Sequence, residues 1–247
     1  MLTAIVLVKN EEKHIKSVLE HLSWADEWIV VDNGSTDSTE RVARKQGATV
    51  LSISTMDFSL MRNSAAKKAK NDWILYIDTD EEISVHLKNE ISKISTSTPS
   101  PDDPSAYVIQ RENYYLHHRW PHKDGMVRLI YKPALVEWYG KIHETAKIHG
   151  TVSVLKNTLI HDTHKSLEEM LSQTNDWSEI EADLRFRAKH PKIVSWRFIR
   201  VLLTGFYDSY ISQNGWKAGT VGIIESIYQG FSLFVTYAKL WEIQIKK

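Results

Sequence analysis

The sequence predicts an α/β protein in which a mostly parallel sheet carries helices on both faces and a helical extension follows at the C-terminal end. Short apolar runs alternate with segments of helical spacing over the first 94 residues. The apolar runs are continuous, as in strands that are buried on both faces. From Ser166 onward the spacing is helical. We therefore expect residues 1–165 to form the sheet domain and residues 166–247 to form the extension.

The first half contains the elements on which this prediction depends. Its apolar runs predict four strands, at residues 3–8, 28–31, 49–53 and 73–77. Helical spacing predicts helices at residues 11–22, 37–46 and 59–70. Gly47 is a typical residue to end the second helix. The connections are short, so consecutive strands are expected to be parallel neighbours.

The second half is less regular. A further helix is expected at residues 84–94, followed by a loop rich in Ser, Thr and Pro at residues 96–104. Strands are expected near residues 106–111 and 126–131, and loop-to-strand segments at 139–144 and 158–161. The extension is predicted to hold helices at residues 167–189, 194–211 and 218–245. The last of these has apolar residues along one face.

Composition restricts the function. The 247 residues are 42% hydrophobic and 25% charged, which is ordinary for a globular protein. The net charge is zero, so nucleic acid is not an expected partner. The absence of cysteine excludes disulfides and thiolate chemistry, and fits a reducing compartment. The first residues lack a basic leader and no apolar stretch reaches about 18 residues, so we expect a cytoplasmic protein.

Three polar loops follow predicted strands. Asp78 and Asp80 come directly after the fourth strand, and residues 9–12 and 32–37 follow the first two. The carboxyl ends of parallel strands share one edge of the sheet, where open α/β sheets bind ligands. Carboxylate oxygens there suit Mg²⁺ or Mn²⁺ bridging to substrate phosphates. Each loop also has a structural interpretation, as a turn or a helix cap.

These loops resemble the nucleotide-binding motifs of inverting family-2 glycosyltransferases, which have the GT-A fold, Rossmann-like in its sheet. The resemblance lies in residues 3–12, 30–39 and 76–82, and in the arginine-asparagine element at 58–63. It continues through residues 126–131 and 140–144. The pattern from residues 215–219 to 241–242 resembles the subgroup of bacterial lipopolysaccharide-core β-glycosyltransferases.

The resemblance implies how a nucleotide-diphosphate sugar donor is held. Asp32 is expected to accept a hydrogen bond from a uracil imide N–H, and Glu11 and Asp78 to bind ribose hydroxyls or the base. Arg62 is expected on base or phosphate, although a surface residue paired with a carboxylate is its alternative. The remaining expected donor-binding residues are Asn10, Asn33, Thr79 and Arg128. Asn33 stands where the family often has an acidic residue.

The metal and the catalytic base are also implied by the resemblance. Asp80 is expected to hold the ion, which neutralises charge on the departing diphosphate. Glu144 is the candidate base for the acceptor hydroxyl, and Asp124, which also reads as a plain turn residue, is the second candidate. His143 is expected to orient Glu144, contact the donor or ligate the metal. His161, with His164 nearby, is a candidate metal ligand or a structural histidine.

Two further surfaces concern the acceptor and the membrane. Aromatic and basic residues gather between Tyr114 and His122, which indicates either an acceptor surface or a hairpin with a packed aromatic core. From Lys192 to Lys247 there are seven Lys and Arg against three Asp and Glu, with seven Trp and Tyr. Basic amphipathic helices of this kind contact anionic membranes, and packing against the catalytic domain or another subunit is the alternative.

We therefore expect a metal-dependent inverting transferase that moves a hexose, with glucose the first choice, from a nucleotide diphosphate to a lipopolysaccharide core, another saccharide or a glycolipid. One rival is a nucleotidyltransferase, although the first loop lacks the glycine-rich phosphate loop of that class. The other rival is a non-catalytic nucleotide-sugar-binding protein, against which the set of acidic residues argues. Assembly into a homo-oligomer is left open.

Overall fold

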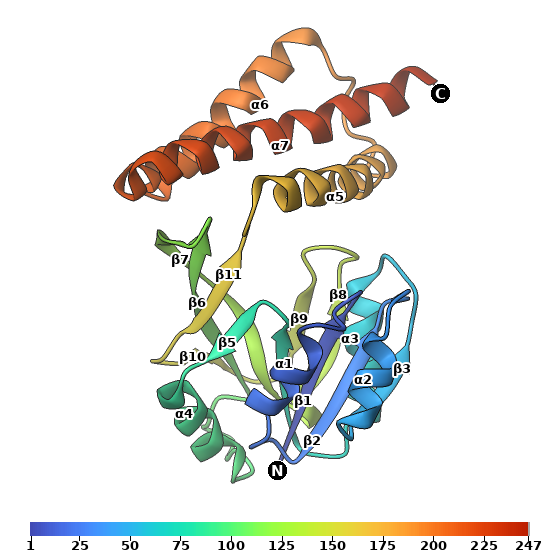
Figure 1. Ribbon diagram of the computed structural model, residues 1–247, viewed down its shortest axis with the longest axis vertical. Helices are drawn as coiled ribbons and strands as arrows, with labels where there is room; N and C mark the ends of the chain where they lie inside the picture. The colour runs from blue at the N-terminus through green and yellow to red at the C-terminus, as the bar shows by residue number, and fades with distance from the viewer. Residues whose placement is uncertain (247) are drawn as a thin grey trace. The chain divides into compact units, whose positions relative to one another are not determined.

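The structure is a computed structural model that describes residues 1–246 (Figure 1). Its strands are β1 Leu2–Val8, β2 Glu27–Asp32, β3 Thr49–Ser52, β4 Trp73–Asp78, β5 Glu81–Ile83, β6 Ala106–Tyr115, β7 His118–Tyr131, β8 Leu135–Tyr139, β9 Thr145–Ile148, β10 Val152–Val154 and β11 Leu159–Thr163. Its α-helices are α1 Ile15–His21, α2 Thr39–Lys45, α3 Phe58–Lys68, α4 Val85–Ser95, α5 Leu167–Arg187, α6 Ser195–Tyr207 and α7 Gly219–Lys246.

The main sheet places the ends of three strands at one edge. The strand order is β3-β2-β1-β4-β7-β6-β11-β5, with β10 paired to β6. The first four strands are parallel, and β7 joins β4 antiparallel. Val8 of β1 lies opposite Asp32 of β2, and Leu7 lies opposite Asp78 of β4. The predicted polar loops therefore do meet at one edge, as parallel pairing requires.

Both faces of this sheet carry a hydrophobic core. Alternate residues of β4 point to opposite faces: Leu75 packs in one core and Tyr76 in the other. The first core is completed by buried residues of α1, α2 and α4, and the second by α3 and by Trp138 of β8. The predicted class, a mostly parallel α/β sheet covered on both faces and followed by helices, is confirmed.

The chain forms two compact units. The first comprises residues 1–111 and 124–160, and the second residues 112–123 and 161–247, of which the last is outside the described part. The second unit therefore takes in the tip of the β6–β7 hairpin as well as α5, α6 and α7. The expected division at residue 165 stays a prediction.

The β6–β7 hairpin differs most from expectation. Strand β6 ends at Tyr115 and β7 begins at His118. The two residues of the turn between them, Leu116 and His117, have positive φ values of +48° and +61°. Such a two-residue turn normally carries Asn or Gly, so its sequence gave no signal. Asp124 and Gly125, expected as a turn, lie inside β7 instead, and that prediction is wrong.

Smaller differences have local causes. Glu81 lies in the short strand β5, which no apolar run predicted, and Ser84 caps α4 by accepting the Leu87 N–H at 3.2 Å. The helix expected at residues 194–211 is α6, continued by a π-helical segment at Asp208–Ser212. Residues 139–144 are mainly the connection between β8 and β9, which pair antiparallel.

The second unit is organised around α7. Both α5 and α6 pack against it. Gly205 of α6 and Gly230 of α7 let the backbones approach closely, since a Cβ on Gly205 would lie 2.9 Å from the Gly230 Cα. Within residues 1–246, no helix is long and apolar enough to cross a membrane.

Candidate functional site

The loops after β1 and β2 hold each other through hydrogen bonds from backbone N–H groups to side-chain oxygens. The Asn10 N–H donates to the Ser35 Oγ at 2.8 Å, and the Asn10 Oδ1 accepts from the Thr36 N–H at 2.8 Å. Asn10 has a φ of +57°, a conformation that asparagine tolerates better than most residues. The alternative interpretation of these loops as helix caps is not met on α1 or α2, neither of which has a side-chain cap: the Asn10 side chain bonds to the neighbouring loop instead.

Asp32 and Asn33 close the second loop. Asp32 is 3% exposed and accepts from the Ser35 hydroxyl and, at 3.3 Å, from the Ser35 N–H. The Asn33 side chain accepts the Thr55 N–H at 2.9 Å. An amide oxygen serves this role as well as a carboxylate would, which gives a structural reason for Asn33. Both side chains remain donor-binding candidates.

Glu11 connects the first loop to the third. Its carboxylate accepts from the Thr79 hydroxyl at 3.2 Å and contacts His14 Nδ1 at 2.8 Å. Its own N–H donates to the Thr39 Oγ1 at 2.7 Å. Glu11 and Thr79, both expected in donor binding, are thus brought together at the end of β4.

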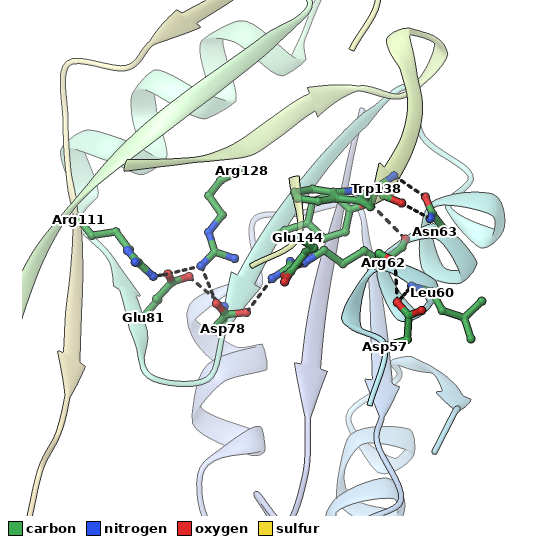
Figure 2. Close-up of polar contacts among 12 residues, drawn as sticks. Asp57, Leu60, Arg62, Asn63, Asp78, Glu81, Arg111, Arg128, Trp138 and Glu144 are labelled. Atoms are coloured by element: carbon green, nitrogen blue, oxygen red, sulfur yellow. Dashed lines mark hydrogen bonds and ion pairs between the residues drawn. The ribbon is translucent and has the colours of Figure 1, made fainter. Parts of the chain in front are cut away.

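An ion cluster lies at the carboxyl end of β4 (Figure 2). Asp78 accepts from Arg128 Nη2 at 2.5 Å and lies 3.6 Å from Arg62 Nη2. Burial by itself raises the pKa of Asp78, but the Arg128 and Arg62 guanidiniums outweigh it and hold that pKa below its ordinary value. Asp78 is therefore a stably ionised carboxylate, and its side chain is still about one-third exposed (32%).

Glu81 forms the inner side of the same cluster. It is completely buried, receives Arg128 Nη2 at 2.5 Å and has Arg111 Nη1 3.5 Å away. It also accepts the Asp78 N–H at 3.0 Å. Burial raises the pKa of Glu81 above its ordinary value against the attraction of Arg128. Burial acts on Arg128 in the opposite sense, yet Asp78 and Glu81 raise its pKa, so the guanidinium stays charged.

Arg62 joins this cluster to Glu144 (Figure 2). Its Nε donates to the Glu144 Oε1 at 2.6 Å, and both side chains are nearly buried, at 4% and 9% exposed. The guanidinium carbon lies 5.2 Å from the Tyr76 ring centroid and 5.0 Å from that of Trp138. Two aromatic faces therefore fix the arginine plane while its carboxylate partners fix its rotation.

Within the described residues, three guanidinium nitrogens of the cluster have no hydrogen-bond partner. These are Arg62 Nη1 and the Nε and Nη1 of Arg128, all buried. Buried donors without an acceptor are costly and uncommon in folded proteins. The cluster therefore has spare donor capacity that suits an anionic or carbonyl oxygen of a ligand.

The metal-binding candidates are Asp80 and His161. Among the described residues no three His, Asp or Glu side chains are grouped so as to enclose an ion. Asp80 and Asp78 nevertheless supply the hard oxygen donors that Mg²⁺ and Mn²⁺ prefer, and such ions often use one or two carboxylates plus substrate phosphates. The donor set fits an ion shared with a substrate. His161 belongs to the second unit, where its Nδ1 contacts the Asn113 Oδ1 at 2.7 Å.

The other candidates lie in varied surroundings. His143 has a φ of +56° in the turn that precedes Glu144. Asp124 forms an ion pair with Arg111 on the neighbouring strand. Within the hairpin tip, Trp120 is 2% exposed, and its ring centroid lies 4.9 Å from that of Tyr115. These two aromatic residues therefore form a packed core.

Sequence reasoning missed two members of the cluster, Glu81 in its inner position and Arg111. A signal existed for Arg128, one of the expected donor-binding residues: it interrupts the apolar run of β7, and such a residue must be paired if it is buried. No comparable signal marked Arg111 or Glu81. The pairing itself depends on β6 and β7 lying beside β4, which no local pattern reveals.

Comparisons with known proteins identify the family of the chain. The family model described as glycosyl transferase family 2 matches residues 3–154. An uncharacterised glycosyltransferase of Rickettsia typhi is 26% identical over 264 residues, covering 99% of this chain and 88% of the relative. The lipopolysaccharide core biosynthesis glycosyltransferase LpsC of Rhizobium meliloti is 23% identical over 256 residues, covering 98% and 92%.

Solved structures give weaker matches. TarS 1–349 of S. aureus in complex with UDP-GlcNAc aligns at 16% identity with a TM-score of 0.48, covering 99% of this chain and 91% of that one. Glucosyl-3-phosphoglycerate synthase of Mycobacterium tuberculosis, crystallised with Mn²⁺, UDP-glucose and phosphoglyceric acid, aligns at 23% identity with a TM-score of 0.35. That alignment covers 47% of this chain and 44% of the synthase.

Proposed function

The chain belongs to glycosyl transferase family 2, and on that premise we propose that it transfers a hexose, with inversion, from a nucleotide-diphosphate donor to a saccharide or glycolipid acceptor. The observation that carries the proposal is the ion cluster at the end of β4. Asp78, Arg62 and Glu144 form one continuous chain of contacts there. A carboxylate such as Asp78 suits a nucleotide, and a guanidinium such as that of Arg62 suits a leaving phosphate. A carboxylate such as Glu144 suits an acceptor hydroxyl that must lose its proton.

The donor is proposed to lie along the edge formed by the loops after β1, β2 and β4. Asp32 offers a buried carboxylate to a base N–H, and Glu11 and Asp78 offer carboxylates to ribose hydroxyls. The unpartnered Arg62 and Arg128 nitrogens are suited to oxygens of the base or diphosphate. Asn10 and Asn33 shape this edge through the backbone bonds they accept.

The proposed reaction is a single displacement. The acceptor oxygen attacks the anomeric carbon as the bond from that carbon to the phosphate oxygen breaks. The acceptor proton passes to Glu144, and the nucleotide diphosphate leaves with the bonding electron pair. Arg62 holds Glu144 in place through its Nε–H, and this bond must lengthen or turn as Glu144 reaches the acceptor. His143, in the preceding turn, is a positioning residue for the same carboxylate.

A divalent cation is proposed as the cofactor, with Asp80 its main protein ligand and Asp78 a second carboxylate. When bound, Mg²⁺ or Mn²⁺ neutralises charge that accumulates on the departing diphosphate. His161 is a further candidate ligand.

The acceptor is proposed to be a lipopolysaccharide core or a related saccharide, and the proposed sugar is glucose. Similarity to LpsC over nearly the whole chain supports the acceptor class. A non-catalytic nucleotide-sugar-binding protein is the remaining alternative. It would bind a donor but leave the sugar attached.

The test is a donor panel. UDP-, GDP- and ADP-linked hexoses are incubated with Mn²⁺ and purified core oligosaccharide, and product is detected by mass spectrometry. We expect one UDP-hexose to be consumed. NMR of the product should show the anomeric configuration opposite to that of the donor. Donor binding is read separately as a Mn²⁺-dependent rise in melting temperature, which does not require an acceptor.

Two variants assign the residues. Asp80→Asn should abolish the Mn²⁺-dependent part of the thermal shift, and Glu144→Gln should keep that shift while losing turnover. A wild-type protein that shows the shift but transfers no sugar to any acceptor would support the non-catalytic alternative. Full turnover in Glu144→Gln would remove Glu144 from the base role and make Asp124 the next candidate.

A further inference from the structure

Helix α6 has two apolar faces, and only one of them is used in packing. Helix α6 packs along α7 (Figure 1). Val201 and Gly205 are buried, and Gly205 lies against Gly230 of α7. This inner face holds α6 on α7. The helix therefore has no need of apolar residues on its other side to stay in place.

The other side is nevertheless apolar. We call Trp196, Ile199, Arg200, Leu203 and Tyr207 the outer face of α6. The apolar members follow one another at intervals of three, four and four residues, so they form a single stripe along the helix. All are exposed: Trp196 by 54%, Ile199 by 63%, Leu203 by 64% and Tyr207 by 61%. Such a stripe is unusual on a surface that meets only water.

The surroundings of this stripe are strongly basic. Residues 184–207 contain no Asp or Glu and hold six Lys and Arg. Arg185 and Arg187 are paired with carboxylates one turn earlier in α5. In the described chain the other four have no carboxylate partner; they are Lys189, Lys192, Arg197 and Arg200. The guanidiniums of Arg197 and Arg200 lie 5.5 and 5.8 Å from the Trp196 ring.

We propose that the outer face of α6 binds the surface of an anionic phospholipid bilayer. A helix that lies in the membrane interface places its apolar side among the upper acyl chains and its basic residues among the headgroups. Trp and Tyr favour this depth because one part of the ring is apolar and another part is polar. Trp196 and Tyr207 stand at the two ends of the stripe, and Arg200 lies within it. Lipid contact at this face is independent of the reaction proposed at the end of β4.

A second copy of the chain is a poorer fit for the same face. In a two-fold dimer the same patch meets itself, so Arg197 and Arg200 would face arginines of the other copy. No carboxylate occurs in this stretch to compensate that repulsion. Anionic headgroups supply the missing negative charge.

The natural chain lacks cysteine, which allows a direct test on the whole protein. An environment-sensitive thiol dye is attached to Leu203→Cys and, as the matched control, to Val85→Cys, which is 71% exposed at the start of α4. Vesicles of about one part phosphatidylglycerol to three parts phosphatidylcholine are then added. We expect a blue shift of the dye at position 203 and none at 85, and loss of the shift in high salt.

Sedimentation with the same vesicles tests the residues. Arg197→Gln/Arg200→Gln should weaken partitioning about tenfold or more, and Lys67→Gln/Lys68→Gln, a charge-matched exposed pair on α3, should leave it unchanged. Equal partitioning of the two pairs would overturn the proposal. An unshifted dye at position 203 would overturn it too, as would a shift caused by protein concentration without vesicles, which would indicate self-association.

Discussion

The loops after β1 and β2 differ from the end of β4 in how their polar groups are satisfied. Asn10 and Asn33 use their side-chain oxygens to accept backbone N–H groups of neighbouring loops. Asp78 and Glu81 instead meet arginine side chains that come from β6, β7 and α3. The first region is a hydrogen-bonded frame, whereas the second is a set of paired charges.

The two regions also differ in what remains unsatisfied. The frame matches short side-chain acceptors to backbone donors, but Arg62 and Arg128 retain buried N–H groups without acceptors. Paired charges can be redistributed when a charged ligand arrives, because each guanidinium carries five donors. This difference indicates that the reacting groups lie in the ion cluster at the end of β4. The frame formed by the loops after β1 and β2 sets the shape of the neighbouring part of the site.

The largest effect is expected at Glu144. Replacing it with Gln should lower kcat by about 10²–10⁴-fold, because the acceptor proton then has no positioned base. Stability should also fall, because the nearly buried Arg62 loses one of its two carboxylate partners, although the amide oxygen can still accept from Arg62 Nε. Steady-state rates with urea denaturation measure both quantities. Glu137→Gln, an exposed glutamate on β8, is the control and should retain full activity.

The next largest effect is expected for Arg128→Met. The change leaves Glu81 buried without its closest cation and frees Asp78, so we expect the free energy of unfolding to fall by about 3–5 kcal/mol. Urea or thermal unfolding measures this loss. Arg41→Met, at an exposed position on α2, should change stability by less than about 0.5 kcal/mol. Similar losses in the two variants would mean that the ion cluster adds nothing to stability.

A smaller effect should appear on acidification. The folded state holds the pKa of Asp78 below its ordinary value, so ionised Asp78 contributes stability that is present above about pH 4 and is lost as the pH falls further. The stability difference between wild type and Asp78→Asn should therefore narrow below about pH 4. Glu81 acts in the opposite sense in both proteins because burial raises its pKa, and the Asp78 charge raises that pKa further in the wild type. A constant difference from pH 7 to pH 3 would contradict the pairing.

The smallest effect is expected in the frame. Ser35→Ala removes the hydroxyl that donates to Asp32 and accepts from the Asn10 N–H, and should cost about 1 kcal/mol of stability. Chemical denaturation measures the cost, with Ser23→Ala at an exposed position as the control. If Ser35→Ala lowered the free energy of unfolding as much as Arg128→Met does, the frame and the ion cluster would not differ in their contribution to stability.

The first half of the fold could be predicted because its signals are local. The runs at residues 3–8 and 73–77 are buried on both faces and are therefore apolar throughout, which places β1 and β4 within a residue or so of their observed bounds. Parallel pairing then brings Asp32 and Asp78 to one edge without further information. For this reason most candidate donor-binding residues could be named from sequence.

The rest depends on contacts between distant segments. The turn at Leu116 and His117 has no turn residues, so the length of the β6–β7 hairpin stayed hidden. Arg111 and Arg128 reach Glu81 only because that hairpin continues the sheet beside β4. The partner of Glu144 is 82 residues earlier in the chain, and no spacing rule predicts such a pair.

The interleaved course of the chain bears on how this protein can be cut into pieces. Residues 112–123 belong with the helices that begin some forty positions later. A fragment ending at residue 160 would keep Trp120 but lose Gln213, to which the indole N–H donates, and Gly215, which lies against its ring. Truncation there would expose the Trp120 ring at the tip of the β6–β7 hairpin and favour aggregation. The intact polypeptide is therefore the better choice for recombinant expression.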